Sequence, residues 1–351
     1  MIKCLNMRYI GNKINLLEFI EKPLIEKNIT GTKFCDIFAG TANVGKHFKK
    51  KGYSIVSNDN MMYSYVFQKT YIENNSTPNF SGLNKIIKDV NVDTVFAYLN
   101  KLKGQKGFIY KNFCIEGSKN SKHERNYFTE ENASKIDVIR DTIDDWKNKK
   151  LITENEYYIL LCSIIEEIPF VSNIAGTYGA FLKIDDPRKF KTYTIKFPEL
   201  ISSNKTHKSY QMDANELVRK IKCDVLYIDP PYNNRQYAPN YHMWETVAVW
   251  DKQLLDRKTG LRPYKDQRSL YCSKDKCVKA FDDLIQNASC DNILFSYNTE
   301  GIIPIDQITR ILSKKGKITK YARDYRRFKS NSKGKKPRES LKELLYLVEV
   351  N

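Results

Sequence analysis

The sequence predicts an α/β protein whose sheet is interrupted by a long, mostly helical insertion. Short apolar runs alternate with helix-like segments in residues 33–73, and the same alternation returns after residue 210. Residues 80–205 between these stretches are polar, rich in Lys and Asn, and mostly helical in pattern. Buried strands that alternate with helices form parallel sheets. We therefore predict a sheet domain built from residues 1–79 and 206–351, with 80–205 as an inserted lobe.

The first half of the sheet follows from four consecutive segments. Residues 33–38 are expected to form a short buried strand, and a Gly-containing turn leads into a helix over about 43–51. A second strand is expected at 53–57, followed by a helix over about 59–73. This order is typical of a parallel β-α-β arrangement.

The second half repeats the alternation. The expected elements, in order, are a helix at 215–221, a strand at 223–228, helices at 240–250 and 276–288, a strand at 292–296, a helix at 305–313, and strands at 317–321 and 344–350. The last two strands are expected to pair as an antiparallel hairpin across a basic loop, 322–338. Within the insertion, the clearest helix is predicted at 153–168.

The charge of the chain favours a polyanionic partner. The formal net charge is +18, and residues 313–338 hold twelve Lys and Arg against one acid, Asp324. Tyr321, Tyr325 and Phe328 are interleaved with these cations. Basic side chains mixed with aromatic ones suit nucleic acid. The alternative is a soluble protein that is merely rich in lysine.

Composition also argues against several classes. The sequence contains no run of about 18 apolar residues, so no membrane span is expected. The N-terminus lacks the apolar stretch of a signal peptide. We therefore predict a cytoplasmic protein. Its eight cysteines form no Cys-x-x-Cys pair and its four histidines show no ligand spacing, so reduced cysteines and no metal site are expected.

The turn after the first strand is the first candidate binding motif. Asp36 ends the strand, Gly40 permits close approach of a ligand to the backbone, and Asp59 follows the second strand, where it can accept ribose hydroxyls. The Gly-x-Gly-x-x-Gly pattern of dinucleotide sites is absent. A phosphate loop fits Gly40 to Lys46, but His47 replaces the required hydroxyl residue. S-adenosyl-L-methionine, which has no phosphate, is the remaining candidate.

The tetrapeptide Asp229-Pro230-Pro231-Tyr232 carries the candidate chemistry. Two prolines fix the backbone and remove two donors, which leaves the Asp229 carboxylate and the Pro230 carbonyl as acceptors beside an aromatic face. Acceptors that bind both hydrogens of an exocyclic amine free its lone pair to attack a sulfonium methyl group in line. The alternative is a tight Pro-Pro turn after an edge strand, with Asp229 as a cap.

With these motifs in this order, the chain resembles the type II adenine-specific DNA methyltransferases of the Dam-like alpha motif order, and most of all their FokI-like branch. The order is an opening segment at Tyr9–Lys13, the Asp36–Gly40 motif, a recognition domain and the catalytic tetrapeptide. The resemblance implies a Rossmann-like S-adenosylmethionine-dependent methyltransferase sheet, with 80–205 as the target-recognition domain that binds DNA.

The resemblance also implies a set of cofactor-binding residues. Tyr9 contacts the methionine part, Lys13 pairs with the methionine carboxylate, and Asp213 accepts from the adenine amine. Asp213 serves equally well as a helix N-cap. The implied set is Tyr9, Lys13, Asp36, Phe38, Gly40, Thr41, Asp59, Asp213 and Asp229. Ala42 departs from the family pattern, in which a second glycine is usual, and we expect slightly weaker cofactor binding.

Substrate residues are implied on the loop after the tetrapeptide. Residues 233–246 match the FokI-like branch closely. Arg235, Gln236 and Tyr237 are expected to hold the flipped nucleotide or its phosphate, Tyr232 to stack on the base, and Asn298 to line the base pocket. His242 is expected to be structural.

The implied function is transfer of a methyl group to N6 of a flipped adenine in duplex DNA, as the modification part of a restriction-modification system. The expected partners are double-stranded DNA and, functionally, a cognate endonuclease. Open alternatives are N4-cytosine methylation, RNA or protein amide methylation, a non-catalytic DNA-binding protein with a degenerate fold, and a nucleotide-phosphate enzyme. The candidate DNA contacts are Lys119, Lys122, Arg125, Arg188 and Lys189.

Overall fold

The computed structural model describes residues 9–255, 257–324 and 342–351, and these form two compact units. The sheet unit comprises Lys13–Asn60, Lys205–Gln236 and Arg268–Asn351. The helical unit comprises Met1–Asn12, Met61–Asn204 and Tyr237–Gln267. Tyr325 and Phe328, and most of the basic loop predicted at 322–338, lie outside the described residues.

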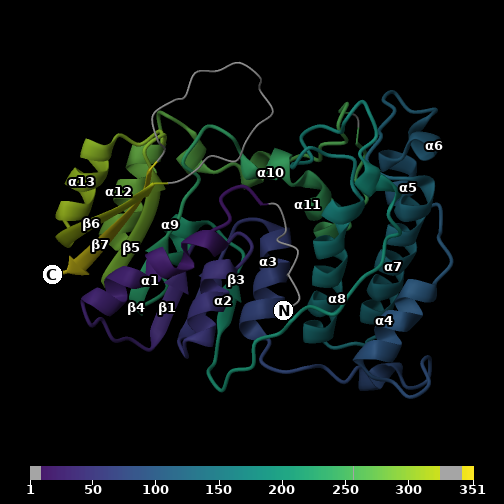
Figure 1. Ribbon diagram of the computed structural model, residues 1–351, viewed down its shortest axis with the longest axis horizontal. Coiled ribbons are helices and arrows are strands. Elements are labelled where there is room, and N and C mark those ends of the chain that lie inside the picture. Colours follow the sequence, from purple (N-terminus) through teal and green to yellow (C-terminus); the bar gives the residue numbers. More distant parts are fainter. Residues whose placement is uncertain (1–8, 256, 325–341) are drawn as a thin grey trace. The chain divides into compact units, whose positions relative to one another are not determined.

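Seven strands of the sheet unit form one sheet among the described residues (Figure 1). They are β1 (Lys33–Asp36), β2 (Ser54–Asn58), β3 (Lys208–Tyr210), β4 (Cys223–Ile228), β5 (Cys290–Asn298), β6 (Gly316–Asp324) and β7 (Lys342–Val350). The order across the sheet is β3-β2-β1-β4-β5-β7-β6. The chain order therefore reverses between β1 and β4, and ligands bind open α/β sheets at such a point, outside the carboxyl ends of the strands.

One strand runs against the others. The pairs β1–β2, β1–β4, β2–β3 and β4–β5 are parallel, whereas β7 is antiparallel to both β5 and β6. In this register Glu343 of β7 lies opposite Asn298 of β5. The predicted antiparallel hairpin of the last two strands is confirmed.

Helices of the sheet unit pack on the sheet because alternate residues of each strand point to opposite faces. These helices are η1 (Ile14–Leu16), α1 (Leu17–Glu26), α2 (Asn43–Lys50), α9 (Ala214–Leu217), η7 (Leu270–Cys272), α12 (Cys277–Asn287) and α13 (Ile305–Ser313). Cys35 and Leu226 join a buried cluster with α9, α12 and α13. Phe34 instead stacks on Phe48 of α2, with 3.8 Å between the ring centroids.

The helical unit contains no strand among its described residues. Its helices are α3 (Met62–Gln68), η2 (Lys69–Glu73), η3 (Ser81–Leu83), α4 (Val92–Lys101), α5 (Phe108–Phe113), α6 (Ile115–Ser118), α7 (Glu130–Asn148), α8 (Glu154–Glu167), η4 (Ile168–Val171), η5 (Pro187–Phe190), α10 (Tyr237–Asn240), α11 (His242–Val249) and η6 (Lys265–Gln267). Thr153 and Glu156 form a capping box that sets the start of α8. Glu156 also accepts from the Phe80 amide, which ties the loop before η3 to this helix.

The structure confirms the predicted fold class, and most elements begin and end within two residues of their predicted bounds. Four details differ. The helix predicted from Asp59 begins at Met62, and the helix predicted over 215–221 ends at Leu217. The strand predicted at 317–321 continues to Asp324, into the predicted loop, and β3 was not predicted. Within the described residues, none of the helices combines the length and apolarity that crossing a bilayer requires.

The compact units and the predicted domains do not share all their boundaries. Residues 61–79 and 237–267 belong to the helical unit, together with most of the predicted insertion 80–205. Periodicity along the sequence reports where helices and strands lie, but it does not report which helices pack together. The assignment of target recognition to 80–205 stays a prediction.

Candidate active site

Two carboxylates meet where the chain order of the sheet reverses. Asp36 ends β1 and pairs in register with Tyr227 of β4, and Asp229 follows the end of β4 directly. Asp36 is buried, and its Oδ1 has no hydrogen-bond partner within the described residues. Burial raises the pKa of Asp36 to about 8, and the nearby charge of Asp229 adds to this shift. This acid is therefore largely protonated at neutral pH when no cation lies beside it.

Asp229 is paired with a buried ammonium group. Lys13 Nζ lies 3.2 Å from Asp229 Oδ1 and 3.6 Å from Glu343 Oε2. Burial raises the pKa of Asp229 to about 6, while Lys13 opposes this rise and Glu343 increases it. Burial alone would lower the pKa of Lys13, but the charges of Asp229 and Glu343 outweigh burial and hold that pKa above its ordinary value. Lys13 thus stays charged and helps to keep Asp229 ionised.

The turn after β1 presents main-chain groups beside these acids. The amide of Ala42 donates to the Ala39 carbonyl at 2.7 Å and closes the turn. Gly40 adopts a φ of +52°, and its amide donates to Asp59 Oδ2 at 2.9 Å. Asp59 thereby fixes the end of β2 against the turn. Ala42 adopts a φ of +59°, a left-handed conformation that favours the glycine usual at this position.

These residues fit a cationic ligand better than an anionic one. Asp229 and Glu343 share one ammonium, that of Lys13, and a third acid, Asp36, lies close enough to Asp229 for the charge of Asp229 to raise its pKa. The buried Asp36 Oδ1 still lacks a donor from the described residues. Buried polar groups are normally satisfied by a partner, so a ligand with positive charge would complete this set. S-adenosylmethionine, whose sulfonium and ammonium groups are cationic, meets that requirement.

The tetrapeptide Asp229-Pro230-Pro231-Tyr232 is anchored at its far end. Pro230 is buried, and Tyr232 is half-buried against the core cluster of the sheet. The carbonyl of Tyr232 accepts from the Ile302 amide at 2.9 Å. This contact joins the tetrapeptide to the turn after β5, where Asn298 Oδ1 accepts from the Glu300 amide. The loop is thus restrained by its prolines and by a neighbouring turn.

A family model described as D12 class N6 adenine-specific DNA methyltransferase matches residues 9–311. The chain belongs to this family. Type II methyltransferase M.FokI of Planomicrobium okeanokoites is 42% identical over 98% of this chain and 52% of that protein. Modification methylase StsI of Streptococcus sanguinis is 41% identical over the same shares. Type II methyltransferase M.NlaIII of Neisseria lactamica is 38% identical over 93% of each chain.

The predicted resemblance to adenine-specific DNA methyltransferases is therefore confirmed, and so is the similarity to the FokI-like branch. The chain spans about half the length of M.FokI and StsI. The family's description names N6 of adenine in DNA as the position that its members methylate.

Other predicted cofactor residues of the D12-class chain have clear structural roles. Asp213 caps α9, because its Oδ1 accepts from the amides of Asn215 and Glu216 at 2.8 and 3.3 Å. Phe38 packs edge-on against Tyr271, with 5.2 Å between the ring centroids. The hydroxyl of Thr41 accepts from Asn43 Nδ2 at 3.0 Å. The N-cap alternative for Asp213 is thus observed, and its role toward the cofactor stays a prediction.

The loop after the tetrapeptide is divided between the two units. In the sheet unit, the side-chain amide of Gln236 exchanges two hydrogen bonds with the main chain of Ser269, at 2.9 and 3.1 Å. Arg235 has an exposed side chain and remains suited to a phosphate contact. In the helical unit, the hydroxyl of Tyr237 donates to the Ile10 carbonyl at 3.3 Å. Gln236 and Tyr237 therefore have intramolecular partners in addition to their predicted substrate roles.

Two of the predicted DNA contacts are buried. The guanidinium of Arg125 donates to the carbonyls of Asn112, Leu255 and Arg257, and the residue is 2% exposed. Lys189 is 5% exposed and pairs with Asp185. Because both side chains are enclosed, these environments contradict a direct DNA contact by either residue. The sequence composition could not show which cations are enclosed.

His242 is structural, as predicted. It is fully buried, and its Nε2 lies 2.8 Å from the Tyr178 carbonyl. Burial lowers the pKa of His242 to about 4. A neutral, enclosed imidazole holds the start of α11 rather than serving as a base.

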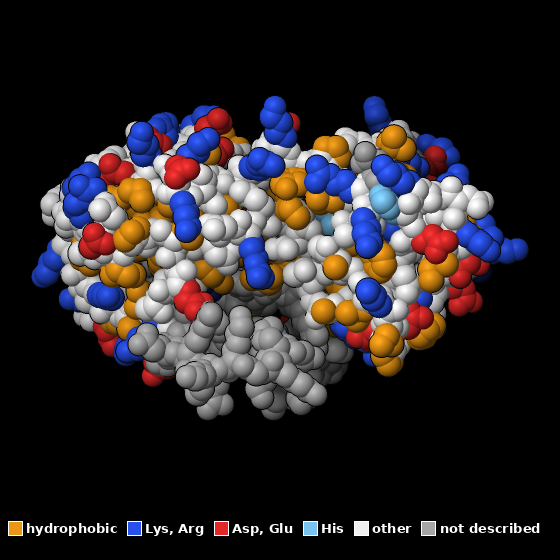
Figure 2. Space-filling view, turned by 90° about the horizontal axis from the view of Figure 1, so that it is seen from above, with side chains coloured by type: hydrophobic (Ala, Val, Ile, Leu, Met, Phe, Trp, Pro, Cys, Tyr) orange, Lys and Arg blue, Asp and Glu red, His pale blue; other side chains and the backbone are white. Residues whose placement is uncertain are grey.

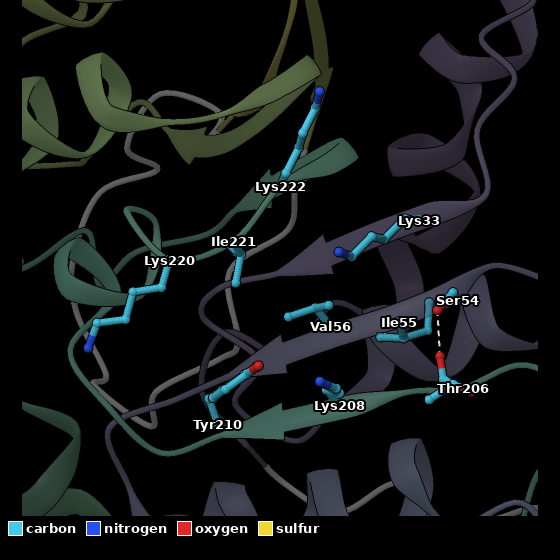
Figure 3. Close-up of a pocket in the computed structure, with 10 residues that line it drawn as sticks. All are labelled: Lys33, Ser54, Ile55, Val56, Thr206, Lys208, Tyr210, Lys220, Ile221 and Lys222. Atoms are coloured by element: carbon cyan, nitrogen blue, oxygen red, sulfur yellow. Dashed lines mark hydrogen bonds between the residues drawn. The ribbon is translucent and has the colours of Figure 1, made fainter.

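A cavity of about 400 Å³ lies elsewhere on the sheet (Figure 3). It is lined by residues of β1, β2, β3 and the segment before β4, namely Lys33, Ser54, Ile55, Val56, Thr206, Lys208, Tyr210, Lys220, Ile221 and Lys222. None of the predicted site residues lines it. Lys220 and Lys222 point in opposite directions in Figure 3, so these two ammonium groups do not converge on one ligand.

Glu343 and Tyr241 make contacts with Lys13 and with the opening segment that the sequence did not reveal. Glu343 precedes the apolar run of β7, and an acid at a strand start is ordinarily a solvent-facing residue. Tyr241 accepts from the Ile10 amide at 2.7 Å, across more than two hundred residues of sequence. Both contacts are long-range, and a single sequence gives no signal for them.

Proposed function

We propose that this chain transfers a methyl group from S-adenosylmethionine to N6 of an adenine at a specific site in double-stranded DNA. The observation that carries the proposal is the buried pair of Asp229 and Lys13 at the end of β4. Asp36 and the Gly40 turn lie at the end of the neighbouring strand, β1. Family membership and the similarity to M.FokI and M.NlaIII support the same reaction.

In this proposal the protein orients an amine and accepts hydrogen bonds from its two N–H groups. Asp229, kept ionised by Lys13, and the carbonyl of Pro230 bind the two amine hydrogens, which returns the lone pair to the nitrogen. Tyr232 stacks on the base and recovers about 1–3 kcal/mol of the few kcal/mol that rotation out of the duplex costs. The bound donor supplies the methyl group, in line with that lone pair.

The donor is proposed to be held by the residues around the β1 turn and the opening segment. Asp36 faces its positive charge, Asp59 accepts from the ribose, and Asp213 accepts from the adenine amine. Tyr9 contacts the methionine part. Lys13 was predicted to pair with the methionine carboxylate, and its contacts with Asp229 and Glu343 give it a second role as their counter-ion.

DNA is proposed to be read by the insertion, 80–205, within a cytosolic modification system that a restriction endonuclease accompanies. Lysine and arginine side chains are spread over the face seen in Figure 2, with hydrophobic side chains between them. The net charge of +18 supports a polyanionic partner. Exposed Lys119 and Lys122 and half-exposed Arg188 remain candidate phosphate contacts.

The decisive experiment incubates the purified protein with labelled S-adenosylmethionine and a mixed population of duplexes, then separates the nucleosides. We expect label in N6-methyladenine. Label in N4-methylcytosine would replace the proposal by its nearest alternative, and absence of any labelled nucleoside would overturn it. Asp229→Ala should retain DNA binding and transfer no methyl group.

A further inference from the structure

The opening segment is held in place by an aromatic cluster of the helical unit. The ring centroid of Tyr9 lies 4.6 Å from that of Tyr241 and 5.7 Å from that of Tyr237. Tyr9 also lies parallel to Trp244, 6.0 Å away. Its hydroxyl is 3.0 Å from the hydroxyl of Tyr63. Four aromatic side chains from α3, α10, α11 and the residue between α10 and α11 therefore enclose one side of Tyr9.

Tyr237 and Tyr241 also bind the main chain of Ile10, the residue after Tyr9. The Ile10 amide donates to the Tyr241 hydroxyl at 2.7 Å, and the Tyr237 hydroxyl donates to the Ile10 carbonyl at 3.3 Å. Both main-chain polar groups of Ile10 are thus taken by side chains four residues apart. The segment Tyr9–Asn12 forms no helix or strand, so these hydrogen bonds replace those that regular structure would supply.

Gly11 shows how closely this segment is fitted. It adopts a φ of +80°, and a Cβ built on it would lie 2.8 Å from the Tyr237 hydroxyl. Any larger residue would meet both a backbone restriction and the tyrosine. The glycine of the opening motif is therefore explained by Tyr237 as well as by the turn itself.

We propose that Tyr237 and Tyr241 are positioning residues that fix Tyr9 for the methionine part of S-adenosylmethionine. This inference rests on the proposed function. Tyr237 was predicted to hold the flipped nucleotide, whereas its hydroxyl in the structure holds the cofactor segment. A prearranged Tyr9 binds without the entropy cost of ordering a loose segment. Removing either hydroxyl therefore weakens cofactor binding although neither tyrosine need touch the cofactor.

The test measures binding of S-adenosylhomocysteine by calorimetry to the wild-type protein, Tyr237→Phe and Tyr241→Phe. Loss of one neutral hydrogen bond should raise each Kd about fivefold. Tyr193→Phe is the matched control, because its buried hydroxyl also donates to a carbonyl, that of Ile164, at 3.0 Å. Its Kd should equal that of the wild type.

A second readout does not depend on the cofactor. Amide hydrogen exchange should be faster at Ile10 in Tyr241→Phe than in the wild type, and unchanged in the control. Unchanged exchange at Ile10 together with unchanged Kd values in both variants would overturn the inference. A wild-type protein that fails to bind S-adenosylhomocysteine would instead overturn the proposed function.

The close approach at Gly11 gives a double-variant test. Gly11→Ala should weaken binding through backbone strain and through its contact with the Tyr237 hydroxyl. In Gly11→Ala combined with Tyr237→Phe the contact is relieved, so the combined loss should be smaller than the product of the two single losses. A combined loss equal to that product would show that the tyrosine does not hold this turn.

Discussion

Lys13 Nζ lies 3.2 Å from Asp229 Oδ1, in a setting where both side chains are largely buried. Such a pair is costly to break, because removal of one partner leaves an uncompensated charge. The third member, Glu343, lies 3.6 Å from the same ammonium and brings a second negative charge. The ionisation of Asp229 thus depends on the balance between these two neighbours.

Lys13→Met should move the acid limb of the pH-rate profile to higher pH. The pKa of Asp229 is about 6 with Lys13 present, and burial and Glu343 both raise it. Without the ammonium the carboxylate takes up its proton at higher pH, and a protonated Asp229 is a poorer acceptor. Methyl transfer at saturating donor is measured as a function of pH. Lys22→Met, at an exposed pair with Glu26, should leave the limb where it is.

Glu343→Gln should move the same limb in the opposite direction. The charge of Glu343 raises the pKa of Asp229, so its removal lets Asp229 stay ionised to lower pH. Glu349→Gln, at an exposed pair on the same strand, is the matched control. A limb that moves upward in Glu343→Gln, or that moves equally in the control, would contradict the assigned charge balance.

Asp36→Asn should become more stabilising as pH rises. Burial raises the pKa of Asp36 from the ordinary 3.8 to about 8. Between pH 3.8 and about pH 8, Asp36 keeps its proton in the folded chain but has lost it in the unfolded chain. The free energy of unfolding of the wild type therefore falls as the pH rises through this range. Asparagine removes this dependence. The free energy of unfolding in urea is compared at the two ends of this range, and a constant difference between the proteins would refute the shift.

Ala42→Val should destabilise the protein by about 2 kcal/mol or more, since a β-branched residue is disfavoured at positive φ. The φ at this position is +59° and the side chain is fully buried. Ala42→Gly should stay within about 1 kcal/mol of the wild type, because relief of strain offsets the lost methyl contact. Thermal unfolding of both variants provides the comparison, and equal losses would indicate that packing rather than backbone geometry governs the site.

Arg125→Met should lower the free energy of unfolding by about 3 kcal/mol, because three buried carbonyls lose their charged donor. Those carbonyls belong to Asn112, Leu255 and Arg257. The salt dependence of DNA binding should not change, since the guanidinium is enclosed. Lys122 is exposed, so Lys122→Met should leave the free energy of unfolding unchanged and should reduce the salt dependence of DNA binding if Lys122 contacts a phosphate. A changed salt slope in Arg125→Met would return this residue to the DNA interface.

Much of the sheet could be predicted from the sequence, for a physical reason. Strands such as Cys223–Ile228 are buried on both faces, so they read as continuous apolar runs between turn residues. β3 escaped prediction because its three residues, Lys208–Tyr210, include an exposed lysine and lie at the sheet edge. Edge strands bury less surface and carry a weaker pattern.

The site could be predicted less completely. Asp36 and Asp229 were found because each follows a strand whose apolar run is visible in the sequence. The partners of Lys13 could not be found, since Glu343 meets it through strand pairing between distant segments. Burial of Arg125 also depends on tertiary packing, and local composition favoured an exposed, DNA-facing cation.

The three-charge group of Lys13, Asp229 and Glu343 draws on segments that are distant along the chain. Closing loops of that length costs conformational entropy, and this cost must be met before the contacts between distant segments can stabilise the fold. A nascent chain still lacking β7 therefore has Asp229 without its full electrostatic setting. Competence for chemistry should therefore appear only after β7 has joined the sheet.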